Sequence, residues 1–311
     1  MPLSHDTLRA ALACPLVETD LPLGERYRGK VRDTYALGAD RLVLVTTDRV
    51  SAFDCVFGEG IPFKGQVLNR LAAHFFRATE DVAPNALLGV PHGNVAVHAR
   101  CDVLPFEFVV RGYLAGHALR TYQSGQRVLC GEPLPEGLRA HERLPAPLLT
   151  PATKAAEGHD EDISRADMLA RGLIDAGTLE EASAMAFALF ARGTEMAAAR
   201  GLILVDTKYE FGRAPDGRLV VVDEIHTPDS SRYWLSGGYD AHVAAGTTPR
   251  QLSKEFLREW LLRLGFSGQE GQPVPALPDE MRLDVAARYV ELYETLTGEA
   301  FVPDPRPLAW A

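Results

Sequence analysis

The sequence predicts an α+β protein organised as two lobes, and three observations carry this prediction. Strand-like segments fill most of the first half of the chain, and a long amphipathic helix, a β-hairpin and two closing helices follow. The regular alternation of strand and helix that a doubly wound parallel sheet requires is missing, so sheets and helices should segregate. A chain of 311 residues has the length of about two average domains.

In the first half, hydrophobic patterning predicts three strands and one helix. The apolar run at 42–45 predicts a buried strand, and the alternation over 95–103 predicts a strand with one apolar face. Residues 106–110 continue this strand-like character after a proline. A helix is expected where apolar side chains recur at the spacing i, i+3, i+4 and i+7, namely Leu68, Leu71, Ala72 and Phe75.

In the second half, a capping box of Thr178 and Glu181 predicts the start of a helix, and Gly201 predicts its end. The apolar run at 202–205 predicts a strand. A Pro-Asp-Gly turn then predicts a hairpin whose arms are residues 208–211 and 219–222. Two helices are expected over 253–264 and 282–296. The proline-rich stretch 133–151 is expected to be a loop that could serve as a lid.

Composition limits the class of protein. Hydrophobic residues make up 46% of the chain and charged residues 24%, which argues against intrinsic disorder. The formal net charge of −10 argues against a nucleic-acid partner, which prefers a basic face. The four cysteines lack metal or redox spacing, as expected of reduced thiols. With no signal-peptide pattern and no membrane-length apolar run, we expect a cytoplasmic protein without a membrane partner.

A basic turn is the first candidate site. Gly29 and Lys30 fall where a hairpin turn is expected, and Arg32 follows. Glycine lets backbone N–H groups approach a phosphate closely, and the two cations would neutralise its charge. The segment is neither a Walker A motif nor a dinucleotide-binding fingerprint. An exposed basic turn without function is the alternative interpretation.

Acids on the predicted hairpin form the second candidate site. Asp206, Lys208 and Glu210 share one face of a strand. The turn folds Asp223 back beside them, within a residue or two of register. Carboxylates grouped at the end of a buried strand suit Mg²⁺, which binds one or two carboxylates together with substrate phosphates. The alternative is a solvated charged face on which Lys208 pairs with an acid.

Two further segments combine arginine with anion-binding features. Ser230, Ser231 and Arg232 follow the hairpin, and a guanidinium binds phosphate or carboxylate through two hydrogen bonds. A capped turn is the alternative. Arg111 ends a predicted strand that leads into a helix, where anions bind well. A structural arginine with a buried stem is the alternative there.

Asp48, Ser51 and Asp54 follow the first buried strand, and loops at strand ends often carry ligand contacts. The spacing of Ser51 and Asp54 fits a helix capping box equally well. The acidic segment 159–162 contains one histidine followed by three acids. Consecutive positions do not share a face, so a zinc site is not expected there.

Taken together, seven segments resemble the SAICAR synthetase family, also called phosphoribosylaminoimidazole-succinocarboxamide synthases. They occur in the family's order between residues 29 and 234, and read GKVRDTY, TTDRVSAFD, IPFKGQVLNRL, CDVLPFEFVVRGYLAG, TPATKAAEGHDEDIS, LVDTKYEFG and DEIHTPDSSRYW. The closing helix with Tyr289 and Tyr293 also looks like the family's C-terminus. The resemblance implies a two-lobed SAICAR synthase-like fold, distantly similar to protein kinases and ATP-grasp enzymes, with ATP between the lobes. We expect a smaller β-rich lobe over 1–108 and a larger α+β lobe over 109–311.

The resemblance implies a ligase of purine biosynthesis. Its reaction joins L-aspartate to carboxyaminoimidazole ribonucleotide and converts ATP to ADP and phosphate, by way of an acyl phosphate, with Mg²⁺ as cofactor. The implied partners are these three small molecules, and the expected assembly is a monomer or a small homo-oligomer. A small-molecule kinase on the same scaffold and a nucleotide-sensing module without turnover are the alternatives.

The resemblance also implies a role for each candidate residue. The catalytic residues would be Lys30, Asp206 and Lys208. ATP would be bound by Gly29, Lys30, Arg32, Lys154, Glu210 and Asp223, of which Glu210 and Asp223 would hold the metal. The other substrates would be bound by Asp48, Ser51, Asp54, Arg111, His117, Asp160, Ser230, Ser231 and Arg232. The chain departs from the family at Gly116-His117, where Gly-Ser is common; a charged imidazole near a phosphate would be favoured there.

Overall fold

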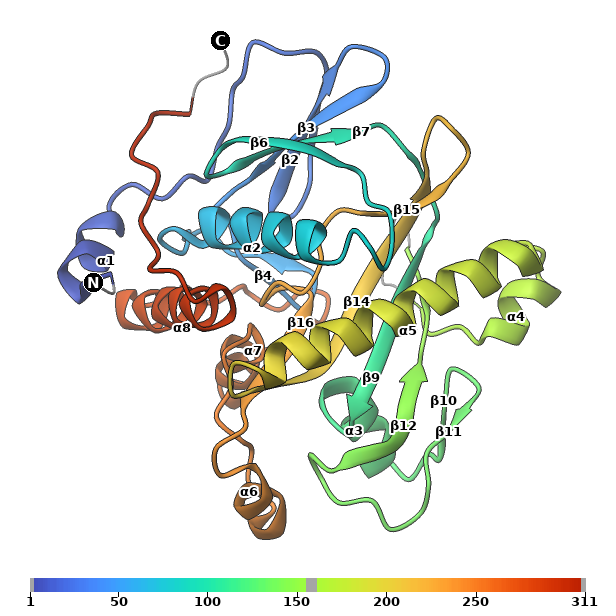
Figure 1. The fold of residues 1–311 in the computed structure, drawn as a ribbon. Coiled ribbons are helices and arrows are strands. Elements are labelled where there is room, and N and C mark those ends of the chain that lie inside the picture. The colour runs from blue at the N-terminus through green and yellow to red at the C-terminus, as the bar shows by residue number, and fades with distance from the viewer. Residues whose placement is uncertain (1–2, 155–160, 309–311) are drawn as a thin grey trace.

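Figure 1 shows the computed structural model, which describes residues 3–154 and 161–308. Within these ranges the chain forms eight helices and sixteen strands. Most strands belong to two sheets, and helices gather around them rather than alternating with strands. The predicted mixture of segregated helix and sheet is therefore confirmed. No helix in the described ranges is long and apolar enough to span a membrane.

The first sheet is antiparallel and has five strands. Their order is β1 (Arg26–Arg28), β2 (Arg32–Leu37), β3 (Arg41–Thr46), β7 (Val95–Ala99) and β6 (Leu87–His92). The predicted strand at 42–45 is β3, and the basic turn lies between β1 and β2 as expected. The prediction of one strand over 95–103 is wrong: β7 ends at Ala99, and the separate β8 (Asp102–Val103) pairs with β14 of the second sheet.

The second sheet has a central path of β12 (Arg143–Leu149), β9 (Phe106–Tyr113), β14 (Leu202–Arg213) and β15 (Leu219–Val222). The strands β8, β13 (Ala152–Thr153) and β16 (Ser231–Leu235) pair along its sides. One strand, β14, includes both the predicted strand at 202–205 and the first arm of the predicted hairpin. The hairpin is confirmed, because Glu210 pairs with Val222 and thus lies next to Asp223 in register.

The prediction of a loop over 133–151 is wrong, because β12 pairs with β9 inside this stretch. The two prolines of β12, Pro145 and Pro147, fall where the register shifts between Arg143 and Leu148. Proline has no N–H group to donate, so it is tolerated at such a bulge on an edge strand. Before it, β10 (Val128–Leu129) and β11 (Glu132–Pro133) form a small hairpin of their own.

Local capping also differs from the sequence interpretation at two places. The helix α5 (Ala176–Ala198) begins before the predicted capping box, because Asp175 is the N-cap and its carboxylate accepts from the backbone N–H of Thr178. The capping-box alternative after β3 is wrong. The strands β4 (Ser51–Ala52) and β5 (Cys55–Val56) form a hairpin there, and Phe53 and Asp54 have positive φ.

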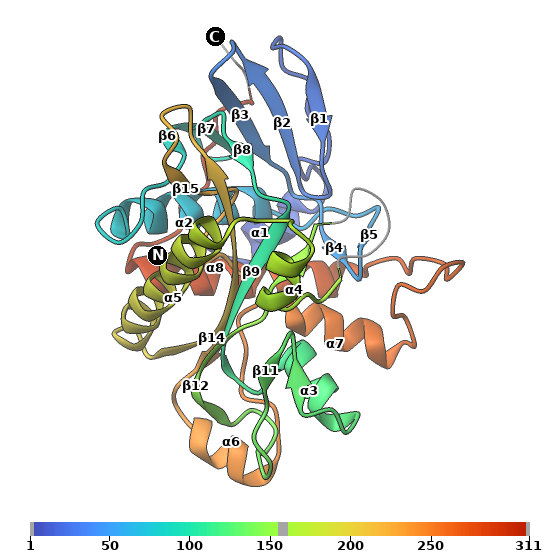
Figure 2. The same ribbon diagram turned by 90° about the vertical axis from the view of Figure 1, so that its right-hand side faces the viewer.

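The helices pack on and between the sheets. Figure 1 shows α5 lying across β14 and β9, and Figure 2 shows it to one side of β14. The helix α2 (Lys64–Ala78) follows the predicted helical pattern. The two predicted closing helices are confirmed as α7 (Glu255–Arg263) and α8 (Asp279–Thr297). The remaining helices are α1 (His5–Ala11), α3 (Gly116–Gln123), α4 (Arg165–Ala170) and α6 (Tyr239–Ala245).

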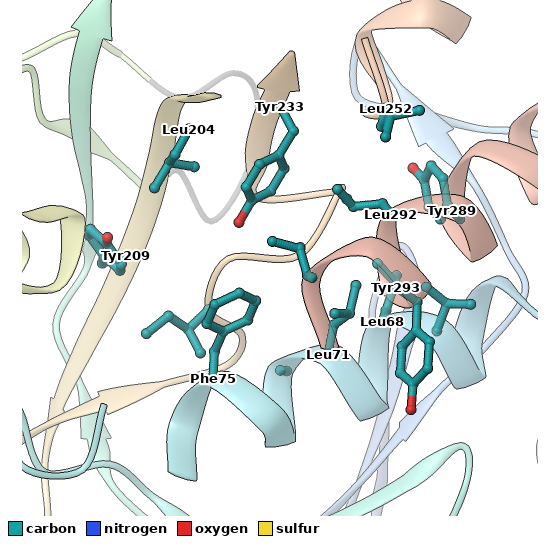
Figure 3. Packing of buried hydrophobic residues seen from close by; sticks show 14 of the residues in the cluster. Leu68, Leu71, Phe75, Leu204, Tyr209, Tyr233, Leu252, Tyr289, Leu292 and Tyr293 are labelled. Atoms are coloured by element: carbon teal, nitrogen blue, oxygen red, sulfur yellow. The ribbon is translucent and has the colours of Figure 1, made fainter. Parts of the chain in front are cut away.

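The main hydrophobic core joins α2 and α8 to the second sheet. Figure 3 shows Leu71 and Phe75 of α2 facing Tyr233 of β16 and Leu292 of α8. The first sheet has a separate, smaller cluster, made of Leu21, Tyr35, Val43, Val45 and Val95. Because α2 belongs to the main core and also contacts β3, β6 and β7, it joins the first sheet to that core.

Candidate functional site

A cavity of about 580 Å³ lies between the two sheets, and we call it the large cavity. Its volume is within the usual range of small-molecule sites, roughly 300–1,000 Å³. One side is formed by the first sheet through Arg32, Leu44 and His98, and the other by Glu210 and Val222 of the second sheet. A ligand bound there would contact both sheets at once.

A smaller pocket of about 40 Å³ adjoins it, and we call it the arginine pocket. The two spaces share Asp229 and Lys254 in their linings, so they are neighbours. The arginine pocket is lined by polar and charged side chains from β14, β16 and α7 and from the segments that directly precede β16 and α7. These include Asp206, Ser230, Ser231, Arg232, Ser253, Glu255 and Arg258.

The lysines of the chain gather at this site. The sequence contains five lysines against 27 arginines. Four of the five line the large cavity, namely Lys30, Lys154, Lys208 and Lys254. The fifth, Lys64, is fully buried and contacts Asp229 in the same lining. All five lysines therefore lie at or next to the large cavity, where their compact ammonium groups could bind anions. The Lys and Arg side chains elsewhere in the chain are all arginines.

Glu210 lies between two of these lysines. Its Oε2 accepts a hydrogen bond from Lys154 Nζ at 2.5 Å, and its Oε1 lies 3.3 Å from Lys208 Nζ. Lys208 Nζ also contacts Oε1 of Glu107 on β9 at 2.5 Å. Burial disfavours the Lys208 ammonium, but the charges of Glu107 and Glu210 outweigh it and hold the pKa of Lys208 well above its usual value. Lys208 is therefore a permanent cation.

Asp223 follows β15 with a φ of 61°. Aspartate tolerates this left-handed conformation better than most residues. Its Oδ1 accepts a hydrogen bond from Arg32 at 3.1 Å, and the same guanidinium contacts Glu224 at 2.9 Å. Arg32 comes from β2, so these ion pairs join the two sheets at the cavity. Asp223 and Glu210 both line the cavity and present oxygen atoms of the kind that hold magnesium.

Asp206 is the centre of the arginine pocket. Its Oδ2 accepts from Arg111 at 3.2 Å and from Arg232 at 2.6 Å. Arg232 also contacts Glu255 at 2.9 Å, and Arg111 donates to the Thr150 hydroxyl. Burial lowers the pKa of Arg232, but Asp206 and Glu255 outweigh it and raise that pKa. The buried Nε of Arg232 has no hydrogen-bond partner within the described part of the chain.

Gly116 explains how Arg232 fits. It has a φ of 51°, and a Cβ atom there would overlap the Arg232 guanidinium. His117 follows it, and its Nε2 lies 2.6 Å from Oδ2 of Asp162. This pair is about half exposed and lines neither pocket. The histidine that departs from the family pattern thus has an acidic partner of its own.

Other predicted residues lie apart from both pockets or at their edge. Ser51 lines the large cavity, and Asp54 contacts Lys30 at 2.5 Å. Asp48 is buried and lines neither pocket; its oxygens accept from the N–H groups of Leu16 and Gly65, both at 2.8 Å. Burial raises the pKa of Asp48 to about 6. A substrate contact by Asp48 stays a prediction.

Asp160 lies outside the described residues. The remaining candidates, Gly29, Lys30, Arg32 and Lys154, all line the large cavity. The structure therefore brings cations from five distant segments around one set of carboxylates: Lys30, Arg32, Arg111, Lys154, Lys208 and Arg232.

Sequence reasoning missed several residues of this site. Glu107, Lys254 and Arg258 line it but were not among the candidates, and Asp229, which directly precedes the candidate Ser230, was given no role. The side chains that Glu107, Asp229 and Lys254 contact in the site are distant from them in the sequence, so no local pattern connects them. The scarcity of lysine was the one available signal, because it singles out Lys254.

Comparison with known proteins agrees with this geometry. The sequence profile described as SAICAR synthetase matches residues 25–274. The phosphoribosylaminoimidazole-succinocarboxamide synthase of Cytophaga hutchinsonii is 54% identical over 275 residues, which cover 88% of each chain. The enzyme of the same name from Legionella pneumophila (strain Paris) is 48% identical over 296 residues, which cover 94% of each chain.

Solved structures show the same fold. The SAICAR synthase from Saccharomyces cerevisiae, complexed with SAICAR, is 31% identical with a TM-score of 0.79. The match covers 92% of this chain and 99% of the yeast chain. A SAICAR synthetase solved in complex with ADP is 26% identical with a TM-score of 0.68, and its match covers 89% of this chain and 100% of that one. The chain therefore belongs to the SAICAR synthetase family.

Proposed function

We propose that this protein catalyses the ATP-dependent ligation of L-aspartate to carboxyaminoimidazole ribonucleotide, giving SAICAR, ADP and phosphate in de novo purine biosynthesis. Relatives with the name of this ligase match 88% to 94% of the chain, which favours ligation over the small-molecule kinase alternative. Within the structure, the supporting observation is the cluster of cations around Glu210, Asp223 and Asp206. All three substrates are anions, while the net charge is −10, so their attraction must be local.

The chemistry requires activation of a carboxylate. Direct attack of an amine on a carboxylate would have to expel oxide. Transfer of the γ-phosphoryl group to a carboxylate oxygen releases ADP and forms an acyl phosphate. The aspartate amine then attacks the carbonyl carbon, phosphate leaves, and the nitrogen loses a proton. Positioning and charge stabilisation supply most of the acceleration in such transfers.

ATP fits the large cavity best. Its lining alternates apolar side chains such as Leu42 and Leu44 with the cations Lys30, Lys154 and Lys208. We assign the basic turn with Gly29, Lys30 and Arg32 to the phosphates, and Lys208 to the charge that develops during transfer. The cavity lies between two sheets, which supports two lobes with ATP between them, distantly similar to protein kinases and ATP-grasp enzymes. The expected division at residue 108 falls inside β9.

Glu210 and Asp223 fit a magnesium ion. Both line the cavity: Glu210 lies on β14 opposite Val222, and Asp223 directly follows Val222. The described residues contain no group of three or more His, Cys, Asp or Glu able to hold a metal ion. This suits Mg²⁺, which takes its other ligands from phosphates and water. When bound, the ion would neutralise phosphate charge, while Lys154 and Lys208 keep the Glu210 carboxylate oriented.

The arginine pocket suits the phosphate of the ribonucleotide. Arg232, Arg258 and Lys254 supply positive charge, and the hydroxyls of Ser230 and Ser231 supply hydrogen bonds. Asp206 holds Arg111 and Arg232 in place and is close enough to this pocket to face the substrate amine. His117 would then contribute from the edge of the site, and a substrate contact by Asp160 stays a prediction. A cytoplasmic location and a monomeric or small homo-oligomeric state stay predictions.

The deciding experiment measures ADP formation by the purified protein. ADP should appear only when ATP, magnesium, aspartate and carboxyaminoimidazole ribonucleotide are all present, with SAICAR in equal amount. ADP formation that continues without aspartate, together with a phosphorylated product, would instead identify a kinase. Exchange of ATP's bridging and non-bridging oxygens in the absence of aspartate would show that phosphoryl transfer comes first.

A further inference from the structure

The buried carboxylate of Asp229 lies where the large cavity meets the arginine pocket, and three side chains converge on it. Its Oδ2 accepts from Lys64 Nζ at 2.9 Å and from Lys254 Nζ at 3.2 Å. Its Oδ1 accepts from the hydroxyl of Tyr289 at 2.6 Å. Lys64 begins α2, Lys254 directly precedes α7, and Tyr289 lies in the middle of α8. Asp229 thus joins three helices to the loop between β15 and β16.

The charges of this cluster do not balance. One carboxylate faces two ammonium groups, and burying an unneutralised charge is costly. Lys64 is 0% exposed, so a ligand cannot reach it. Lys254 lines both pockets and has three N–H donors, of which Asp229 accepts one. The surplus positive charge is therefore available to an anion only at Lys254.

The titration of Lys254 agrees with this imbalance. Burial lowers the pKa of Lys254 to about 8, and the opposing charge of Asp229 offsets burial only in part. The other charged groups that act on Lys254 are Arg258, Lys64 and Glu224. A bound anion would favour the charged ammonium and raise this pKa.

We propose that Tyr289 and Lys64 are positioning residues, which act through Asp229 to hold the Lys254 ammonium at the junction of the two pockets. The hydroxyl on Oδ1 and the enclosed ammonium on Oδ2 together fix the rotation of the carboxylate. The Lys254 ammonium group can consequently bind Asp229 only at Oδ2. Its remaining N–H groups then point toward the pockets. This inference rests on the proposed function, because it treats the two pockets as the sites of two anionic substrates.

Tyr289 lies beyond the segment that the family profile matches. The profile covers residues 25–274, whereas α8 spans Asp279–Thr297. Tyr289 is fully buried and packs in the main core, as Figure 3 shows, yet its hydroxyl points to Asp229 rather than to solvent. The helix α8, which otherwise contributes hydrophobic packing, thereby supplies one hydroxyl group that contacts Asp229 at the junction of the two pockets.

The test compares Tyr289→Phe with the matched control Tyr293→Phe. Tyr293 lies one turn further along α8 and is equally buried, but its hydroxyl accepts from Arg70, and it lines neither pocket. Loss of the Tyr289 hydroxyl frees Oδ1 to attract Lys254 away from the pockets. We expect the KM values for ATP and the ribonucleotide to rise about ten-fold with kcat within about three-fold of wild type. The control should stay within about two-fold.

A second measurement follows the environment of Lys254 by an NMR titration of its pKa, which does not depend on catalytic activity. Because the chain has five lysines, biosynthetic labelling with ¹³Cε-lysine gives five lysine NMR signals, and Lys254→Arg identifies one of them by its loss. In Tyr289→Phe the pKa of Lys254 should rise, since Oδ1 becomes a second partner for its charge. In the wild type, ATP with the ribonucleotide should raise it too. Thermal unfolding of each variant verifies folding.

Two results would overturn the proposal. One is a Lys254 signal that titrates identically in wild type, Tyr289→Phe and Tyr293→Phe. The other is an equal change in KM for both tyrosine variants. Failure of the proposed function would look different, because the wild type would then form no aspartate-dependent ADP while the Lys254 titration still responded to Tyr289→Phe.

Discussion

Replacing Asp206 by asparagine should leave two buried guanidinium groups facing a neutral amide. The Oδ2 of Asp206 accepts from both Arg111 and Arg232, and the three side chains are 4%, 8% and 14% exposed. Arg232 keeps its contact with Glu255, but Arg111 loses the one ion pair that it makes among the described residues. A buried charge without a counter-charge should therefore be created at Arg111.

The magnitude follows from these contacts. A hydrogen bond to a charged group contributes about 1.5–3 kcal/mol, and removal of one partner from a buried pair costs about 3–5 kcal/mol. Arg232 loses its 2.6 Å ion pair with Asp206 but keeps the ion pair with Glu255. The oxygen of the asparagine side chain can still accept one hydrogen bond. We therefore expect Asp206→Asn to lower the free energy of unfolding by about 3 kcal/mol.

Urea unfolding of wild type and variant measures this difference. The control is Asp40→Asn, because Asp40 is exposed and lies 3.7 Å from an exposed Arg41, so its loss should change stability by less than about 0.5 kcal/mol. The ribonucleotide should stabilise Asp206→Asn more than wild type, since its phosphate replaces the missing negative charge. A loss below about 1 kcal/mol, or equal stabilisation by the ribonucleotide, would refute the reasoning.

Three further predictions follow from the site and the core. Asp223→Asn should lower kcat by at least about 100-fold with an unchanged circular dichroism spectrum, and near-normal turnover would exclude its role with the metal. Arg232→Ala should raise the KM for the ribonucleotide about ten-fold or more, whereas an effect on kcat alone would exclude phosphate binding in the ground state. Burial lowers the pKa of His226 from 6.5 to about 3, so the neutral ring favours folding above pH 6.5 and this contribution falls as the pH drops toward 3. Between pH 6.5 and 5 the loss is about 2 kcal/mol, and urea unfolding of His226→Leu should lack that part of the pH dependence.

Local patterns predicted much of the fold. The strand at 42–45, the helix around Leu68 and Phe75, and the hairpin of β14 and β15 are confirmed, because each is specified by side-chain periodicity or by turn residues within a short segment. Predictions were wrong where a short sequence pattern is compatible with more than one local structure. Asp175 caps α5 in place of Thr178, and the prolines of β12 are accommodated at a bulge.

The candidate site was predictable only in part. The strand residues Asp206, Lys208 and Glu210 follow from period-two alternation, and the turn places Asp223 beside them. The partners of these residues come from remote positions. Lys208 contacts Glu107, which is 101 residues away in the sequence, and no local pattern connects the two.

The sequence by itself determined the family, the strand that carries the central acids and six of the cations, namely Lys30, Arg32, Arg111, Lys154, Lys208 and Arg232. Those features depend on residue type and on spacing over a few positions, which a linear pattern records. Only the tertiary structure decided which cation meets which carboxylate. Asp229 joins Lys64, Lys254 and Tyr289, which are separated from it by 165, 25 and 60 residues. Such contacts form when the hydrophobic core packs α2, α7 and α8 against one another. A buried charge is costly without a partner, so each buried charge pairs with a group of opposite charge or a hydroxyl that this packing brings close to it.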